Sequence, residues 1–221
     1  MTVDKELLLC LPQRILSFFD RFPVKRIDLG RSGNAVFRIG DAYYLKLSED
    51  IEGLTAEKNR DLWLENRLTA PQVLDYGECV SNGRKTADLA FLLTSAVKGK
   101  PLCHETYLAD PDRLIFYLAE AMAIFHALPF KECPFFAERG ASHTNKTVVC
   151  HGDFCLPNIH CDNGKIGFVD LGDMGKGDPW LDYAWCLWSL DYNLKTPVYR
   201  DKMLQKLGIA FDDEKYRQYI L

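Results

Sequence analysis

A chain of 221 residues is long enough for one large domain or for two small lobes, each with its own buried core. Apolar residues make up 48% of the chain and charged residues 26%, and the net charge of −4 argues against a nucleic-acid-binding surface. Because no apolar stretch is long enough to span a bilayer and no signal peptide is recognisable, we expect a cytoplasmic protein with no membrane partner.

The first predicted elements are a helix over residues 4–20 and a strand–turn–strand unit over residues 27–39. The turn of this unit contains Gly30, Ser32 and Gly33. Backbone N–H groups in such a turn can bind phosphate oxygens, and glycine allows the phosphate to approach closely. Since any hairpin can contain two glycines, the turn alone is weak evidence for a nucleotide site.

The next predicted strand covers residues 41–47, and its alternation places Tyr44 and Lys46 on one face with leucines on the other. A lysine in such a strand either reaches solvent or binds an anion, and a solvent-exposed strand face is the simpler explanation. The helix predicted next, from about residue 55 to 67, carries Glu57. Taken alone, Glu57 is explained as a solvated carboxylate in the first turn, which the helix dipole favours.

Two further strands, over 73–76 and 90–94, precede a break in the pattern at 98–101 that marks a boundary between lobes. A long amphipathic helix then begins after Asp110, which is expected to be its N-cap. His126 lies beside the apolar stripe of this helix and is better explained as a structural histidine than as a catalytic one. The stripe consists of Leu114, Leu118, Met122, Phe125 and Leu128.

The most informative stretch runs over residues 151–172. Asn163-Gly164 between apolar-rich segments predicts a two-residue hairpin turn, and the resulting register places Asn158 and Asp170 at the same end of the hairpin. An amide oxygen and a carboxylate at that end form an oxygen-rich site, which suits Mg²⁺ better than zinc or copper. Asp153 is then left to orient an attacking hydroxyl, so the pattern predicts phosphoryl transfer.

The eight cysteines are irregularly spaced, which indicates buried thiols in a reducing compartment rather than a disulfide framework. No pair among the neighbouring cysteines and histidines has the spacing of a structural zinc site, and adjacent residues of a strand point to opposite faces. We therefore expect core thiols instead of a zinc site. The residues concerned are Cys150, His151, Cys155, His160 and Cys161.

A resemblance to a known family lies in the same stretch. The spacing His151-x-Asp153, then Asn158, then Asp170-x-Gly172 resembles the catalytic loop and the metal-binding segment of the kinase superfamily. The longer sequence around these residues, HGDFCLPNI followed by GFVDLGDMGKGDPWLDYA, resembles the aminoglycoside phosphotransferases, in particular their 3′-phosphotransferase branch. The same pattern includes two aspartates that we expect to support the loop structurally, Asp178 and Asp182.

The match is specific over residues 150–190 and fainter over 30–128. It implies an α+β, bilobal protein-kinase-like fold. Residues 1–96 would form a small N-terminal nucleotide-binding lobe with an antiparallel sheet and a helix. Residues 97–221 would form a mainly helical C-terminal lobe with the catalytic hairpin and the acceptor-binding surface.

The resemblance also implies roles for the residues of both lobes. The cofactors would be ATP (or GTP) and Mg²⁺, with the metal held by Asn158 and Asp170 and with Asp153 as the catalytic residue. Lys46 would hold the nucleotide phosphates and pair with Glu57. Backbone groups near the boundary between the lobes would bond the purine. The expected nucleotide-binding residues are Gly30, Ser32, Gly33, Tyr44, Lys46, Glu57, Ser95 and Val97.

The acceptor region departs from the family pattern. The segment between Cys133 and His151 is short, and the sequence ends at Leu221, where the family pattern leads us to expect a short acidic tail. Family members carry arginines and acidic residues where this chain does not, and Asp173 and Asp191 could partly replace the lost acids. The positions that lack the expected arginines or acids are Asp173, Trp188, Tyr192 and Asn193.

We expect a small cationic acceptor, in the first place an aminoglycoside antibiotic, and hence a function in antibiotic resistance. A first alternative is a kinase for another hydroxyl compound, such as an amino alcohol, a sugar, a macrolide or a peptide antibiotic. A second alternative is a nucleotide-binding protein that no longer turns over.

Overall fold

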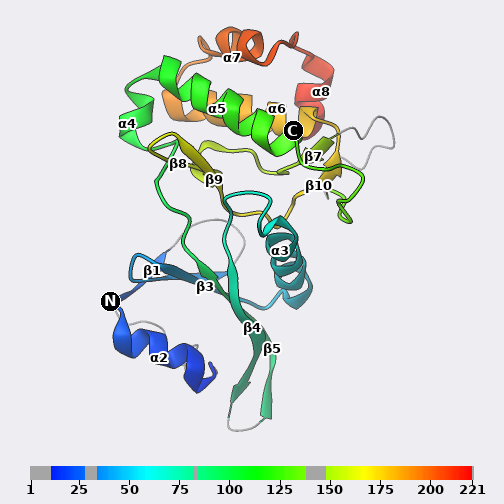
Figure 1. The fold of residues 1–221 in the computed structure, drawn as a ribbon. Helices are drawn as coiled ribbons and strands as arrows, with labels where there is room; N and C mark the ends of the chain where they lie inside the picture. The colour runs from blue at the N-terminus through cyan, green and yellow to red at the C-terminus, as the bar shows by residue number, and fades with distance from the viewer. Residues whose placement is uncertain (1–10, 28–33, 82–83, 138–147, 221) are drawn as a thin grey trace. The chain divides into compact units, whose positions relative to one another are not determined.

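The computed structural model describes residues 11–27, 34–81, 84–137 and 148–220. By its internal contacts the chain divides into two compact units (Figure 1). The first unit comprises residues 1–62 and 71–96, and the second comprises residues 63–70 and 97–221. Among the helices of the described residues, none combines the length and the apolar character needed to cross a membrane.

The first unit contains a five-stranded sheet in the order β1-β2-β3-β5-β4, in which each neighbouring pair is antiparallel. A helix packs on each face of this sheet. The strands are β1 (Val24–Ile27), β2 (Ala35–Ile39), β3 (Tyr43–Ser48), β4 (Val73–Ser81) and β5 (Arg84–Ser95), and the helices are α2 (Gln13–Arg21) and α3 (Ile51–Leu64).

The alternation of side chains along β5 shows how the two helices share the sheet. Phe91 and Leu93 join the core that contains Ile15 of α2, whereas Leu92 packs with Leu54 of α3. Successive residues of a strand point to opposite faces, so each helix receives every second side chain. Phe91, Leu92 and Leu93 are all buried, which explains why the apolar run of β5 over residues 89–93 is continuous instead of alternating.

Helix α3 begins four residues earlier than expected, at Ile51 instead of residue 55. Its N-terminus is stabilised by Asp50, whose carboxylate accepts a hydrogen bond of 2.9 Å from the backbone N–H of Gly53. Residues 63–70, which the sequence analysis placed with residues 1–96, group by their contacts with the second unit. Leu64 belongs to the core of the second unit, and the Thr69 carbonyl accepts a 2.9 Å hydrogen bond from the N–H of Phe168.

The second unit is mainly helical, with short strands that carry the loop around Asp153. The expected helix after Asp110 is present as α5, with the Asp110 carboxylate accepting from the N–H of Arg113, and its apolar stripe is buried as predicted. The helices are α4 (Glu105–Leu108), α5 (Pro111–His126), α6 (Trp180–Leu194), α7 (Arg200–Leu207) and α8 (Asp213–Ile220), with a 3₁₀ turn η1 (Leu156–Asn158). The strands are β6 (Lys100–Pro101), β7 (Val148–Cys150), β8 (Ile159–Asp162), β9 (Lys165–Phe168) and β10 (Gly175–Gly177).

The predicted hairpin is formed by β8 and β9. Asp162 pairs with Lys165, and Asn163 and Gly164 have φ angles of 51° and 86°. Positive φ at both central residues is what a two-residue type I′ turn requires, and Asn-Gly adopts it readily. The N–H of Val169 donates to the carbonyl of Asn158 at 3.0 Å, so the register continues to the end of the hairpin as expected.

Candidate active site

Asp153 and Asn158 are brought together by the loop that joins β7 to β8. The amide nitrogen of Asn158 donates to the Asp153 carboxylate at 2.9 Å and to the Asp153 carbonyl at 3.0 Å. Because both partners are acceptors, the Asn158 side chain must present its NH₂ group to Asp153. Its amide oxygen is then the atom available to a cation, and the Asp153 carboxylate is held in a fixed orientation.

Asp170 lies at the same end of the hairpin, directly after Val169. Its φ angle is 59°, a left-handed conformation that costs a non-glycine residue about 1–2 kcal/mol. Backbone strain of this kind concentrates at functional sites, where the position of a side chain matters more than local stability. The structure therefore brings Asp153, Asn158 and Asp170 to one end of the hairpin, as the sequence predicted.

The loop is held in place by Asp182 of α6, whose side chain is fully buried. Its two oxygens accept hydrogen bonds from the backbone N–H groups of His151, at 2.9 Å, and Gly152, at 3.0 Å. His126 adds a third contact, with its Nε2 2.9 Å from Asp182. His126 is thus a structural residue, as expected, and Asp182 is the aspartate that supports the loop.

Asp178 has a different structural role from Asp182, at the start of α6. Its carboxylate accepts a hydrogen bond from the N–H of Trp180 at the start of α6 and forms an ion pair of 2.9 Å with Lys215 of α8. It therefore stabilises the N-terminus of α6, where a negative charge is favoured. The expectation that Asp178 is a structural residue agrees with this position.

Ser189 was missed by the sequence analysis. Its hydroxyl accepts a hydrogen bond of 3.0 Å from the N–H of Leu156, so α6 contacts the loop a second time, two turns after Asp182. The sequence does contain a signal for this contact, because Asp182 and Ser189 are seven residues apart and therefore lie on the same face of α6. Its partner, however, is 33 positions away in the chain, so the spacing alone does not identify it.

Gly152 is required by the shape of the loop. Its φ angle is +91°, and a Cβ atom at this position would lie 2.5 Å from the carbonyl oxygen of Asp173. We expect Gly152→Ala to lower the free energy of unfolding by about 1–3 kcal/mol more than a matched alanine substitution without a clash. Denaturant unfolding followed by fluorescence measures the difference.

Gly164→Ala is the matched control. Gly164 has a φ angle of +86°, close to that of Gly152, but nothing lies within 4 Å of an added Cβ. The control therefore reports the cost of a side chain at positive φ, and the difference between the two variants reports the clash. Equal destabilisation by the two substitutions would show that the loop is not closely packed against Asp173.

In the first unit, Lys46 and Glu57 form a bidentate ion pair. The ammonium of Lys46 lies 2.6 and 2.8 Å from the two carboxylate oxygens of Glu57, and both side chains are largely buried. The pair forms because Lys46 points to the sheet face that α3 covers. Glu57 is not in the first turn of α3, since the helix begins at Ile51, so the simpler explanation of Glu57 is wrong.

Of the other residues expected to bind the nucleotide, the structure describes Tyr44, Ser95 and Val97. Tyr44 lies on the same face of β3 as Lys46, by the alternation of the strand. The Ser95 N–H donates to the carbonyl of Gln72 at 2.9 Å, so this backbone donor is already engaged within the first unit. Val97 belongs to the second unit, beside Gly167. Gly30, Ser32 and Gly33 lie outside the described residues.

The cysteines around the loop are core thiols, as expected. Burial raises the pKa values of the Cys150 and Cys155 thiols, so both remain protonated. Ligand atoms of His126, Cys150 and Asp182 lie within 4.8 Å of one another. The Cys150 thiol donates to the Asp178 carbonyl, and Asp182 accepts the hydrogen bonds of the loop, so each of these two groups has a structural role.

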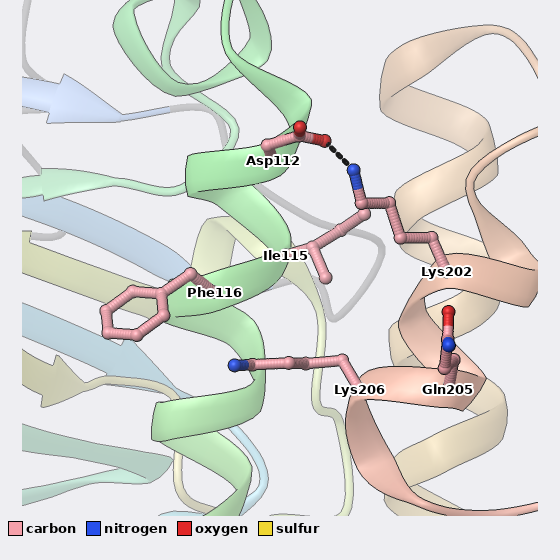
Figure 2. A pocket seen from close by; sticks show the side chains of 6 residues that line it. All are labelled: Asp112, Ile115, Phe116, Lys202, Gln205 and Lys206. Carbon is pink, nitrogen blue, oxygen red and sulfur yellow. Dashed lines mark hydrogen bonds and ion pairs between the residues drawn. The ribbon is translucent and has the colours of Figure 1, made fainter.

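A pocket of about 460 Å³ between α5 and α7 is separate from this site. Lys202 forms an ion pair with Asp112, and the Lys206 ammonium lies 5.3 Å from the centroid of the Phe116 ring (Figure 2). These α5 residues precede His126 by at least ten positions, or roughly 15 Å of helix. The lining residues are Asp112, Ile115, Phe116, Lys202, Gln205 and Lys206.

The two units together define a class of protein. A lysine–glutamate pair on an antiparallel sheet and its helix, with a separate helical unit that carries the Asp153 loop, is the arrangement of kinase-like phosphotransferases. The family model described as "Phosphotransferase enzyme family" matches residues 23–143 and 138–219. The chain therefore belongs to this family, which confirms the resemblance to the aminoglycoside phosphotransferases.

Curated relatives support the same assignment. The streptomycin 3″-kinase of Streptomyces griseus is 30% identical, with 88% of this chain and 89% of the relative covered. An aminoglycoside 3′-phosphotransferase of Staphylococcus aureus is 27% identical, covering 90% of this chain and 88% of the relative.

A solved structure confirms the predicted kinase-like α+β fold. The aminoglycoside phosphotransferase APH(3″)-Id of Streptomyces rimosus is 25% identical, with a TM-score of 0.75, and the match covers 99% of this chain and 97% of that one. A structure of the same enzyme with ADP and streptomycin is 26% identical, with a TM-score of 0.67, covering 94% of this chain and 95% of that one.

Proposed function

We propose that the protein transfers the γ-phosphoryl group of ATP to a hydroxyl of an aminoglycoside and so confers antibiotic resistance. The arrangement of Asp153, Asn158 and Asp170 at one end of the β8–β9 hairpin carries this proposal. The relatives support the acceptor class, since the S. griseus enzyme is a streptomycin kinase and the S. rimosus structure holds ADP and streptomycin. The cytoplasm is the location that fits the cysteine usage.

Asp153 is the residue that acts on the acceptor. Phosphoryl transfer passes through a loose transition state, so the protein contributes positioning and charge stabilisation more than covalent chemistry. The hydrogen bond from Asn158 to one Asp153 oxygen fixes the plane of the carboxylate. The acceptor hydroxyl donates its hydrogen bond to the other oxygen, and its proton moves there as its oxygen bonds to the γ-phosphorus. The bond between the γ-phosphorus and the bridging oxygen to the β-phosphate breaks, and ADP leaves.

Asn158 and Asp170 are the residues that would hold Mg²⁺. Their donor atoms fit this ion, because an amide oxygen and a carboxylate are hard oxygen ligands and the Asn158 nitrogen is turned toward Asp153. A bound Mg²⁺ supplies positive charge to the phosphate oxygens of the nucleotide.

Lys46 and Glu57 carry the nucleotide part of the proposal. The Lys46 ammonium is held by both oxygens of Glu57, so it is positioned to neutralise the nucleotide phosphates without further ordering. Tyr44 would pack on the base, and backbone groups near Ser95 and Val97 would contact the purine. ATP is the proposed nucleotide, with GTP as the alternative that the same contacts allow.

We expect Asp170→Asn to abolish most of the phosphate transfer while leaving the fold intact. Asparagine tolerates positive φ, so the backbone conformation at this position is retained. The substitution removes the negative charge that would hold the cation. The measurement is the turnover rate as a function of Mg²⁺ concentration, together with thermal unfolding. Unchanged turnover at all Mg²⁺ concentrations would exclude Asp170 as a metal ligand.

An acceptor panel tests the proposed function against its alternatives. ADP release is measured with streptomycin and kanamycin, with choline-like amino alcohols, with simple sugars and with macrolides. The proposal predicts turnover with an aminoglycoside. Turnover with another class alone would identify a different small-molecule kinase, and nucleotide binding without transfer to any acceptor would identify a protein that no longer turns over.

A further inference from the structure

Helix α6 carries three aromatic rings, two of them exposed, that the mechanism above does not use. Trp185, Trp188 and Tyr192 follow one flank of the helix, and we call them the aromatic ladder. The rings of Trp188 and Tyr192 are stacked, with centroids 5.3 Å apart and planes at 11°, and Trp185 meets Trp188 edge-on at 5.6 Å. Trp188 is 36% exposed and Tyr192 is 59% exposed, so this part of the ladder is accessible from solvent.

The ladder adjoins the loop that carries Asp153. Ser189, which follows Trp188, accepts a hydrogen bond from the N–H of Leu156 in this loop. Asn193, which follows Tyr192, donates to the carbonyl of Ser189 at 2.7 Å and to its hydroxyl at 3.3 Å. One face of α6 therefore holds the loop while the next flank carries the ladder, both within the second unit.

The ladder already binds a cation from its own chain. The ammonium of Lys195 lies 4.1 Å from the centroid of the Tyr192 ring, well within the range of a cation–π interaction. Lys195 is the C-cap of α6, in the left-handed conformation with φ 58°. Its long side chain is flexible, so another cation can displace the ammonium at a small cost.

We infer that the aromatic ladder is a binding wall for the acceptor and that it selects acceptors carrying a guanidinium group. This inference rests on the proposed function and names the substrate class of the same site. A guanidinium is planar and weakly hydrated and stacks on aromatic faces, whereas an ammonium is compact and strongly hydrated. An acceptor guanidinium takes the place of Lys195 on Tyr192, with Trp188 holding the Tyr192 ring in position.

Streptomycin, which carries guanidinium groups, and kanamycin, which carries amino groups only, are the probes. Their dissociation constants are measured by calorimetry, and KM and kcat are measured for transfer from ATP. We expect Trp188→Ala and Tyr192→Ala each to weaken streptomycin binding by about 2- to 30-fold, the range of a cation–π contact. KM for streptomycin rises correspondingly, kcat changes little, and kanamycin is much less affected.

Three further variants sharpen the test. Tyr192→Phe keeps the ring and should bind streptomycin like the wild type. Lys195→Met removes the competing ammonium and should tighten streptomycin binding. Val198→Ala, at a residue that is 74% exposed, is the neutral control. Weaker binding in Lys195→Met would show that Lys195 assists the acceptor instead of competing with it, which contradicts the inference.

The outcomes separate this inference from the proposed function. If streptomycin is phosphorylated but its KM and dissociation constant are the same in Trp188→Ala and Tyr192→Ala, the inference is overturned and the proposed function stands. If streptomycin binds through Tyr192 but no aminoglycoside is phosphorylated, the ladder is supported and the proposed function fails. If streptomycin does not bind, the inference is overturned.

Discussion

Asp153→Asn is expected to reduce kcat by about 10²- to 10⁴-fold, the range that a positioned general base contributes. The carbonyl oxygen of the new amide can still accept the hydrogen bond from Asn158, so the loop keeps its conformation. What faces the acceptor hydroxyl is then an NH₂ group, which cannot take a proton. The measurement is single-turnover transfer from ATP at saturating aminoglycoside, with the nucleotide dissociation constant measured alongside.

The control for this prediction is Asp162→Asn. Asp162 is an aspartate of the same β8–β9 hairpin, at the turn end, where it pairs with Lys165. The control should show wild-type turnover, and both variants should bind the nucleotide like the wild type. Full turnover by Asp153→Asn would rule out the role assigned to Asp153.

Asp182→Ala is expected to be the most destabilising single substitution around the loop. The Asp182 side chain is fully buried and accepts the N–H groups of His151 and Gly152. Its removal leaves two buried N–H donors without an acceptor, at about 1–3 kcal/mol each, and His126 without its partner. We expect a loss of about 3–5 kcal/mol in the free energy of unfolding, measured by denaturant titration.

His126→Gln removes the imidazole ring but keeps a donor to Asp182. We therefore expect this variant to lose no more than about 1 kcal/mol. A loss as large as that of Asp182→Ala would show that the imidazole ring, and not the hydrogen bonds to Asp182, accounts for most of the stabilisation. A loss of less than about 1 kcal/mol in Asp182→Ala would mean that the loop is held by other contacts.

Local sequence signals were sufficient to predict the β8–β9 hairpin and helix α5. The hairpin depends on Asn163 and Gly164, two adjacent residues that accept positive φ, so its register follows from the sequence. Helix α5 has an N-cap and a regular apolar stripe and was predicted equally well. The start of α3 was misplaced because its signal is the single residue Asp50, which bonds the N–H of Gly53.

Contacts between distant segments could not be derived from the sequence. Alternation along β3 determines the face of Lys46, but its pairing with Glu57 also requires α3 to pack on that face, through Leu54. Asp191 was suggested as a substitute for missing acidic residues. In the structure its carboxylate pairs with Arg200 at the start of α7 instead, a partner that no local pattern indicates.

The most direct test of the proposed function is the transfer of a labelled γ-phosphoryl group from ATP to an aminoglycoside. Streptomycin and kanamycin are incubated separately with the wild-type protein, Mg²⁺ and labelled ATP, and the antibiotic is isolated and analysed by mass spectrometry. The account predicts that at least one of them gains a single phosphoryl group and that Asp153→Asn does not produce it. If neither antibiotic is labelled while the nucleotide is bound, the protein is not an aminoglycoside kinase.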